Sequence, residues 1–221
     1  MAEVHLMARY PRSKRPIAER GRTVTDADRQ LSRQFGKDYF DGDRMHGYGG
    51  YNYHPRFWTD TVALMREHYG LADDASILDV GCAKGFMLHD FQRLMPRARL
   101  AGVDISRYAI DNAKPEVKPF LQVGDARRLP FADHSFDLVT AINVVHNFEL
   151  DECAQALLEI QRVAARHAFI VVDAWRNEAE RLALGDWGLT CLTAMHVDDW
   201  KAFFARIGYQ GDFDWTITET L

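Results

Sequence analysis

The sequence has few cysteines and no long apolar run. Three of its 221 residues are cysteine (Cys82, Cys153 and Cys191), and they are too widely spaced to form a metal-binding pair. So few cysteines suit a reducing compartment better than a disulfide framework. No segment approaches the roughly 18 apolar residues of a membrane-spanning helix, and the first residues lack the apolar core of a secretory signal. We therefore expect a cytoplasmic protein without a membrane partner.

The chain also lacks the G-x-G-x-x-G sequence of dinucleotide sites. Instead, an apolar run ends at Asp79 and Gly81, and the next glycine is Gly85, which gives a G-x-x-x-G spacing. A second apolar run ends in another carboxylate, Asp104, 23 residues after Gly81. A strand, a tight turn, a helix and a second strand tipped by an acid form a nucleotide-type cofactor site. The spacing favours an adenosine-bearing ligand that has no pyrophosphate.

Charge is unevenly distributed along the chain. The net charge of −5 disfavours a dedicated nucleic-acid binder. Residues 1–37 hold nine Lys or Arg and four Asp or Glu, which leaves a net charge of −10 for the rest of the chain. This basic arm is either a solvated tail or a segment that packs over an active site or onto a partner subunit. A homodimer closed by aromatic side chains of this region is compatible with the sequence but not required by it.

From residue 77 onward, apolar strand patterns alternate with helical ones. Strands are predicted near 77–80, 99–103, 119–123, 136–142 and 167–173, and helices near 85–95, 106–113, 151–164 and 197–207. The strands are continuously apolar, which is typical of a parallel sheet buried on both faces. Residues 209–218 alternate instead, like a late edge strand that could run antiparallel. We expect an α/β fold, a Rossmann-like, doubly wound and mostly parallel sheet with an N-terminal helical and loop extension.

Ahead of the sheet, Thr25 is the predicted N-cap of a helix that runs toward Phe35, and residues 56–69 have helical spacing. Residues 46–55 are rich in glycine and aromatics, so they form a loop that is a candidate lid. We divide the chain into residues 1–47, a basic arm and helix that could contribute to the lid, and residues 48–221, a single domain with an insertion near 175–195.

Several segments together resemble class I S-adenosylmethionine-dependent methyltransferases of the small-molecule type. They are residues 77–85, Asp104, Gly124-Asp125-Ala126 and residues 129–137, and the resemblance spans about residues 75–175. It implies a methyltransferase that uses S-adenosylmethionine as cofactor. By similarity, Asp79, Gly81 and Gly85 border the methionine part, Asp104 binds the ribose, and Asp125 with Ala126 binds the adenine. The full expected cofactor set is Asp79, Gly81, Cys82, Ala83, Gly85, Asp104, Ile105, Asp125, Ala126, Asn143 and Arg56.

Methyl transfer from a sulfonium is an in-line displacement with a neutral leaving group, so it needs alignment and exclusion of water. A hydroxyl or protonated amine acceptor also needs a base. We expect the catalytic residues to be His146, just past the fourth strand, Asp173 at the end of the fifth strand, and Tyr51 of the loop. For His146 the alternative is a structural histidine that caps a helix or bonds the backbone.

The acceptor is expected to be a small molecule, methylated on oxygen or nitrogen: a sugar, an amino acid or a natural-product intermediate. Substrate-binding candidates are Tyr48, Tyr53, Trp175, Arg176 and His196. No metal site is expected, because the acids at 149–152 suit a helix start. RNA or protein methylation and a non-catalytic S-adenosylmethionine-binding module are the alternatives, and a nicotinamide-dependent oxidoreductase is a further one. Asn143-Val144-Val145-His146 replaces the Asn/Asp-Pro-Pro-Tyr/Phe motif of DNA amino-methyltransferases, which disfavours DNA as a substrate.

Overall fold

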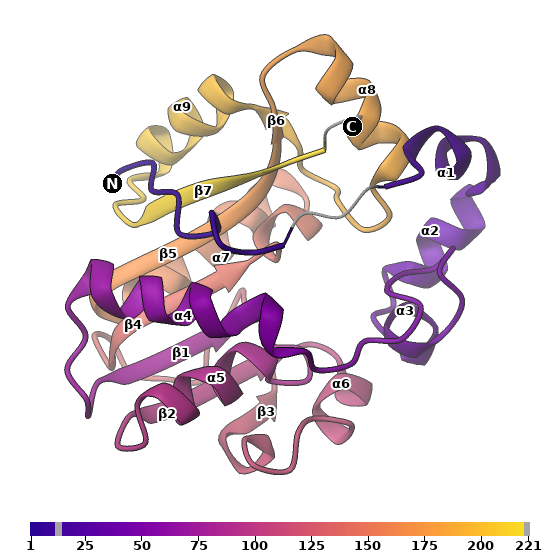
Figure 1. Cartoon of the computed structure of the whole chain (residues 1–221). Coiled ribbons are helices and arrows are strands. Elements are labelled where there is room, and N and C mark those ends of the chain that lie inside the picture. The colour runs from indigo at the N-terminus through magenta and orange to yellow at the C-terminus, as the bar shows by residue number, and fades with distance from the viewer. Residues whose placement is uncertain (12–14, 219–221) are drawn as a thin grey trace.

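The computed structural model describes residues 1–11 and 15–218, and its centre is one parallel sheet (Figure 1). The described strands are β1 Ser76–Val80, β2 Arg99–Asp104, β3 Leu121–Val123, β4 Phe136–Ile142, β5 Ala164–Trp175, β6 Met195–His196 and β7 Asp212–Ile217. Their order is β3-β2-β1-β4-β5-β6, and β7 also pairs with β5. Every pairing between these strands is parallel. The predicted Rossmann-like α/β class is confirmed.

The direction of the last strand, β7, differs from the antiparallel alternative that the sequence left open. β7 runs parallel to β5, with Asp212 opposite Phe169 and Ile217 opposite Ala174, so the antiparallel reading of residues 209–218 is wrong. The reason is the helix α9 (Val197–Ile207), which precedes β7. A crossover through a helix returns the chain to the sheet in the same direction, whereas an antiparallel strand follows a hairpin turn.

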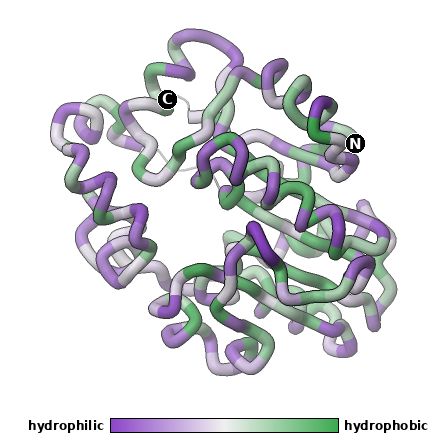
Figure 2. Tube along the Cα trace, turned by 180° about the vertical axis from the view of Figure 1, so that it is seen from behind, coloured by the Kyte–Doolittle hydropathy of each residue, from purple (hydrophilic) through white to green (hydrophobic). Residues whose placement is uncertain are grey.

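Helices cover both faces of the sheet. α4 (Pro55–Tyr69) and α5 (Phe86–Leu94) pack on one face, while α7 (Leu150–Val163) and α9 pack on the other. Apolar residues therefore concentrate along the central strands (Figure 2). Short segments connect these elements: α6 Arg107–Asp111, α8 Glu178–Trp187 and the 3-10 turns η1 Lys118–Phe120 and η2 Val145–Asn147. Among the described residues, no helix is long and apolar enough to cross a membrane.

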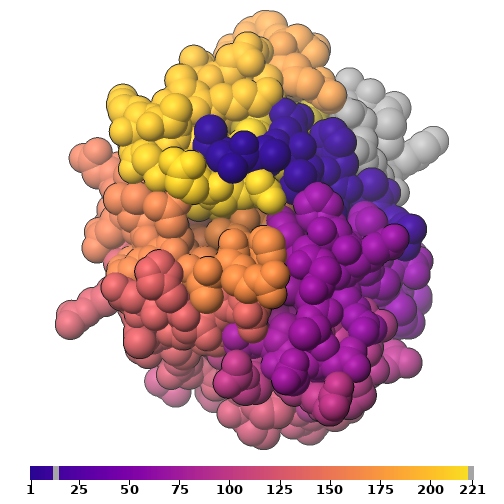
Figure 3. Space-filling model, turned by 90° about the vertical axis from the view of Figure 1, so that its left-hand side faces the viewer, coloured from indigo at the N-terminus to yellow at the C-terminus, as the bar shows by residue number. Residues whose placement is uncertain are grey.

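The N-terminal segment lies against the far end of the chain. The Val4 N–H donates to the Phe213 carbonyl at 2.9 Å, and the Phe213 N–H donates to the Ala2 carbonyl at 3.0 Å, so the first residues extend the sheet beyond β7. Figure 3 shows this indigo segment lying on the yellow C-terminal one. Of the two readings of the basic arm, packing against the body of the protein is therefore the one observed for these residues.

Three short helices follow: α1 Ile17–Thr23, α2 Asp26–Ser32 and α3 Lys37–Asp41. Thr25 caps α2 as predicted, and Asp28 completes a capping box. α1 lies beside α8 (Figure 1), where the Arg20 guanidinium stacks 4.0 Å from the centre of the Trp187 ring. The three helices form a column on one side of the sheet and bring the basic arm to the ends of its strands.

Candidate active site

A cavity of about 560 Å³ lies between the carboxyl ends of the strands and the N-terminal arm. Open α/β sheets bind ligands at this edge, and small-molecule sites typically occupy roughly 300–1,000 Å³. The N-terminal region before residue 48 contributes His5, Tyr10, Arg33 and Tyr39 to its wall, the loop 46–55 contributes Tyr51, and β7 contributes Asp214. The expected cofactor residues that line it are Asp79, Gly81, Cys82, Ala83, Asp104, Ile105, Asp125, Ala126 and Asn143.

The turn after β1 needs glycine for two reasons. Gly81 has φ +74°, and a Cβ there would lie 2.2 Å from Val144 Cγ2. Gly85 also has φ +74° and caps the start of α5. Between them Ala83 has φ 48°, a conformation that costs a residue with a Cβ some strain. The G-x-x-x-G spacing thus gives a left-handed turn at the cavity floor, and Gly85 acts through this turn without lining the cavity.

Asp104 accepts hydrogen bonds that hold this turn in place. Its Oδ2 accepts from the Ala83 N–H at 2.7 Å, and its Oδ1 accepts from the Ser106 N–H at 2.8 Å. Burial raises the pKa of Asp104, and these two bonds oppose the shift. Each carboxylate oxygen has a second lone pair, so Asp104 can accept two further hydrogen bonds from vicinal hydroxyls.

Asp79 lies next to it at the end of β1 and is 5% exposed. Burial raises its pKa to about 8, although Asp79 Oδ1 accepts a hydrogen bond from Thr140 Oγ1 at 2.9 Å. Neither Asp79 nor Asp104 makes an ion pair with any residue that the structure describes. Two buried acids without a cation fit a ligand that brings an ammonium group and ribose hydroxyls, which S-adenosylmethionine does.

Asp125 is held by a residue that the sequence analysis did not single out. Arg127 donates to Asp125 Oδ2 through Nη2 at 2.6 Å and to Asp125 Oδ1 through its backbone N–H at 2.8 Å. Arg127 also pairs with Glu152 and stacks over Phe148. These bonds lower the pKa of Asp125 and occupy much of its accepting capacity. An adenine amine at Asp125 must therefore share the carboxylate with Arg127.

The end of β4 carries an unusual backbone conformation. Asn143 lines the cavity with φ 58°, and its N–H donates to the Val171 carbonyl at 2.9 Å. Its Oδ1 accepts a hydrogen bond from Thr216 Oγ1 of β7 at 2.7 Å. Asparagine tolerates this region better than most residues, and such strain is common at binding sites. The bond to Thr216 ties the ends of β4 and β7 together at the cavity wall.

Aromatic residues of the loop 46–55 close part of the cavity. The Tyr51 ring stacks on Phe86 at 4.8 Å and lies 4.3 Å from Tyr48. Burial raises the pKa of Tyr51 well above its usual value, so its phenol stays protonated near neutral pH and is unsuited to act as a base. Tyr53 does not line the cavity, because its hydroxyl donates to Asp90 Oδ1 at 2.6 Å on α5.

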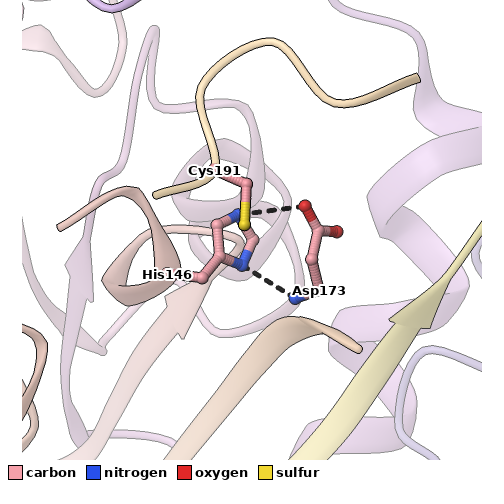
Figure 4. Close-up of side chains that lie close together, drawn as sticks. All are labelled: His146, Asp173 and Cys191. Atoms are coloured by element: carbon pink, nitrogen blue, oxygen red, sulfur yellow. Dashed lines mark hydrogen bonds and ion pairs between the residues drawn. The ribbon is translucent and has the colours of Figure 1, made fainter. Parts of the chain in front are cut away.

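His146 and Asp173 lie together behind the cavity wall (Figure 4). The Asp173 backbone N–H donates to His146 Nδ1 at 2.8 Å, and His146 Nε2 lies 3.5 Å from Asp173 Oδ2. His146 is 3% exposed, and burial lowers its pKa. Because Nδ1 accepts a hydrogen bond, the neutral ring carries its proton on Nε2, facing the carboxylate. In this geometry the histidine orients Asp173 and has no lone pair free for an acceptor.

Cys191 joins this pair, and ligand atoms of the three side chains lie within 4.8 Å of one another. Burial raises the pKa of the Cys191 thiol, with the nearby Asp173 charge adding to the shift. A protonated thiol is a poor metal ligand, and both ring nitrogens of His146 already have partners. We therefore assign no metal to the cluster.

The remaining predicted residues lie outside the cavity lining. Arg56 stacks on the Phe57 ring at 4.7 Å, and Trp175 follows Asp173 on β5 without reaching the lining. Arg176 pairs with Glu180 of α8 at 2.9 Å. His196 caps α9, with its Nδ1 accepting from the Asp198 N–H at 3.2 Å.

The sequence analysis missed a second histidine and acid pair, which does line the cavity. His5 Nδ1 lies 3.3 Å from Asp214 Oδ1, and Asp214 is 6% exposed. The Trp215 N–H donates to the same carboxylate oxygen at 2.9 Å. With Asp214 accepting from Nδ1, the lone pair of His5 Nε2 is free. The only sequence signal was the expectation that the basic arm could pack over an active site.

The parallel sheet and the site at its carboxyl edge define the fold of class I methyltransferases, whose methyl donor is S-adenosylmethionine. Residues 78–172 match a family model described as a methyltransferase domain.

Individual relatives agree with this assignment. A malonyl-[acyl-carrier protein] O-methyltransferase of Legionella pneumophila is 36% identical over 32% of this chain and 26% of its own length. The methyltransferase GfsG of Streptomyces halstedii is 25% identical over 84% of this chain and 75% of its own length. The crystal structure of MccD protein shares the fold, with a TM-score of 0.55 at 21% identity over 70% of this chain and 72% of that one. The chain spans 26% to 47% of the length of the first four curated relatives.

Proposed function

We propose that this protein transfers the methyl group of S-adenosylmethionine to an oxygen or nitrogen atom of a small molecule held in the cavity. The observation that carries the proposal is the position of Asp79 and Asp104. Both are buried carboxylates without a cation among the described residues, and both line one cavity with the His5–Asp214 pair. A cavity that suits a cationic, ribose-bearing ligand and is also lined by a histidine and acid pair supports methyl transfer to an acceptor that has to lose a proton.

The proposed roles follow from the contacts of each residue. Asp79 binds the ammonium group of the cofactor, which favours the ionised carboxylate. Asp104 accepts hydrogen bonds from the two ribose hydroxyls. The hydrogen bonds that its carboxylate accepts from the backbone N–H groups of Ala83 and Ser106 keep it in place. When bound, S-adenosylmethionine supplies an electrophilic methyl group on a sulfonium that departs as a neutral thioether. Tyr51 and Tyr48 cover the cavity and exclude water, which aligns the acceptor and protects the donor.

For a hydroxyl or ammonium acceptor, we propose His5 as the base in place of His146. The His5 side chain is 71% exposed, but it lines the cavity and its Nδ1 lies 3.3 Å from Asp214 Oδ1, so Asp214 orients the ring and leaves Nε2 to take the proton. His146 is enclosed and faces Asp173 with both nitrogens. We keep Asp173 as a group that His146 positions next to the cavity wall.

An acceptor of small size is supported by the volume of the cavity, which cofactor and acceptor must share. A sugar, an amino acid or a natural-product intermediate remains the proposed class, and O-methylation is also the reaction that the name of the Legionella relative states. A cytoplasmic location is proposed from the three free cysteines. The alternatives are methylation of RNA, methylation of a protein, and cofactor binding without catalysis. The following experiment distinguishes them.

The test is formation of S-adenosylhomocysteine. The purified protein is incubated with S-adenosylmethionine and pools of sugars, amino acids and hydroxylated aromatics, with RNA and protein extracts as further arms. We expect release of S-adenosylhomocysteine with a small-molecule pool, and loss of this release in Asp104→Ala. Turnover that occurs only with RNA or protein contradicts the proposed acceptor class. Cofactor binding without turnover in any arm leaves the non-catalytic module as the function.

A further inference from the structure

We propose that the methyl acceptor carries an oxyanion, a carboxylate or a phosphate, that binds the guanidinium of Arg33. This inference rests on the proposed function, because it names the chemical class of the acceptor in the same cavity. Arg33 is the C-cap residue of α2 and lines the cavity from the arm side.

The first observation is that the Arg33 side chain lacks a partner. Its Nε is buried and has no hydrogen-bond partner, and no residue of the described ranges 1–11 and 15–218 forms an ion pair with it. Neighbouring arginines differ: Arg20 Nη2 donates to the Arg44 carbonyl at 2.6 Å, and Arg29 Nε donates to the Gly188 carbonyl at 3.3 Å. Buried donors are satisfied in nearly all native structures, so the unpartnered Arg33 Nε at the cavity wall indicates a ligand that supplies an acceptor.

The second observation is the distribution of charge around the cavity. Asp79 and Asp104 line the cofactor part and offer an anion no cation. Arg127 also lines the cavity, but Asp125 and Glu152 already hold its guanidinium. Arg33 lines the same cavity and has no acid partner among the described residues, so we assign the anionic group to it.

No acid among the described residues forms an ion pair with Arg33. The positive charge of Arg33 lowers the pKa of the Cys191 thiol, whereas burial and the negative charge of Asp173 raise it. Arg33 and Asp173 therefore both act on the same thiol. Asp173 faces His146, however, and makes no ion pair with Arg33. The guanidinium fork binds a carboxylate or a phosphate through two parallel hydrogen bonds, so the ligand that we propose for Arg33 is an oxyanion.

A competing use of Arg33 is to hold the carboxylate of the cofactor, and the experiment separates the two. The protein is first saturated with S-adenosylhomocysteine, and the complex is titrated calorimetrically with benzoate, with phenyl phosphate and with the neutral benzamide. We expect one of the anions to bind at least about tenfold more tightly than benzamide, and the two anion arms decide between carboxylate and phosphate. The same titrations are made with Arg33→Gln, with Arg33→Lys and with Arg22→Gln, which removes an exposed arginine of α1.

In Arg33→Gln the affinity for the anion falls about 10- to 100-fold, the effect of losing charge-assisted hydrogen bonds. Arg33→Lys keeps part of the affinity, Arg22→Gln keeps all of it, and S-adenosylhomocysteine binds all variants equally. The inference is overturned if benzamide binds as well as the anions, if the anion affinity survives in Arg33→Gln, or if S-adenosylhomocysteine binding falls in that variant. Failure of the wild-type protein to bind S-adenosylhomocysteine at all overturns the proposed function instead.

Discussion

The Lys84 ammonium lies 2.6 Å from Asp41 Oδ2, across 43 residues of sequence. Lys84 belongs to the left-handed turn at the cavity floor, and Asp41 ends α3 of the arm. Lys84 Nζ also donates to the Tyr51 carbonyl at 2.9 Å, and Asp41 Oδ2 accepts from the Tyr108 hydroxyl at 2.7 Å. One buried lysine therefore fastens the aromatic loop to the turn that forms the cofactor site.

Breaking this pair is expected to loosen the arm. In Lys84→Met the carboxylate of Asp41 loses its cation, and we expect the free energy of unfolding in urea to fall by about 2–3 kcal/mol. This is less than the roughly 3–5 kcal/mol of a fully buried pair, because the Asp41 side chain is 23% exposed. Hydrogen exchange of residues 37–51 should quicken, while the exposed Lys118→Met leaves both quantities unchanged. Equal exchange in both variants contradicts the role of Lys84 as a fastener.

The raised pKa of Asp79 predicts a pH dependence of stability. The unfolded chain releases this proton near pH 3.8 and the folded protein near pH 8, so the folded state binds more protons between these values. The free energy of unfolding of the ligand-free protein therefore falls as pH rises from about 4 to about 8. Asp79→Asn keeps an acceptor for Thr140 and should remove this component of the slope. Urea unfolding of the wild-type protein and of Asp79→Asn at pH 5 and pH 8 measures this component. If the free energy of unfolding changes equally with pH in the two proteins, Asp79 ionises normally.

The same ionisation couples to the cofactor. An ammonium group beside Asp79 favours the carboxylate, so binding releases a proton from this residue at neutral pH. Affinity for S-adenosylhomocysteine should therefore increase from pH 6 to pH 8 in the wild-type protein, and much less in Asp79→Asn. Calorimetry in two buffers of different ionisation enthalpy detects the released proton directly. A lack of proton release at pH 7 contradicts the assignment.

Asp104 and Asp125 should differ in their importance for the cofactor. Asp104→Ala removes two acceptors for the ribose and the bonds that hold the turn, so we expect about 100-fold weaker binding of S-adenosylhomocysteine. Asp125→Ala should cost about tenfold or less, because Arg127 already shares its carboxylate. The matched pair is measured by calorimetry under one set of conditions. A larger loss in Asp125→Ala would reverse the roles given to the two acids.

We expect opposite effects on catalysis from mutations in the His5–Asp214 pair and in the His146–Asp173 pair. With a hydroxyl or ammonium acceptor, His5→Gln should lower kcat by about 100-fold and remove the ionisation of the base from the pH profile. His146→Gln should mainly lower stability, because a buried side chain with two partners is lost. Its pH profile should keep the shape of the wild type. If His146→Gln changes the profile and His5→Gln does not, the first prediction from the sequence is the better one.

The sequence predicted the sheet and the turn because both depend on local patterns. Continuous apolar runs identify buried parallel strands, and Gly81 and Gly85 stand where the backbone adopts positive φ. The alternation of residues 209–218 did not give the direction of β7, and the signal for a parallel strand was the helix predicted at 197–207, because a crossover through a helix keeps the strand direction.

The partners of the site residues depend on contacts between distant segments. His5 and Asp214 are 209 residues apart, and Lys84 and Asp41 are 43 apart. No periodicity links such positions, so the sequence alone did not predict these pairs. Arg33 likewise stood among other basic residues of the arm, and no local pattern distinguished it from them.

The central claim is that the cavity binds S-adenosylmethionine and not a dinucleotide. Calorimetric titration of the purified protein with S-adenosylmethionine, S-adenosylhomocysteine and NAD tests it most directly. The account predicts that the first two bind with dissociation constants on the order of micromolar and that NAD gives no heat of binding. It also predicts that Asp104→Ala loses this affinity. Binding of NAD alone, or equal binding of all three ligands by the wild-type protein and Asp104→Ala, would contradict the claim.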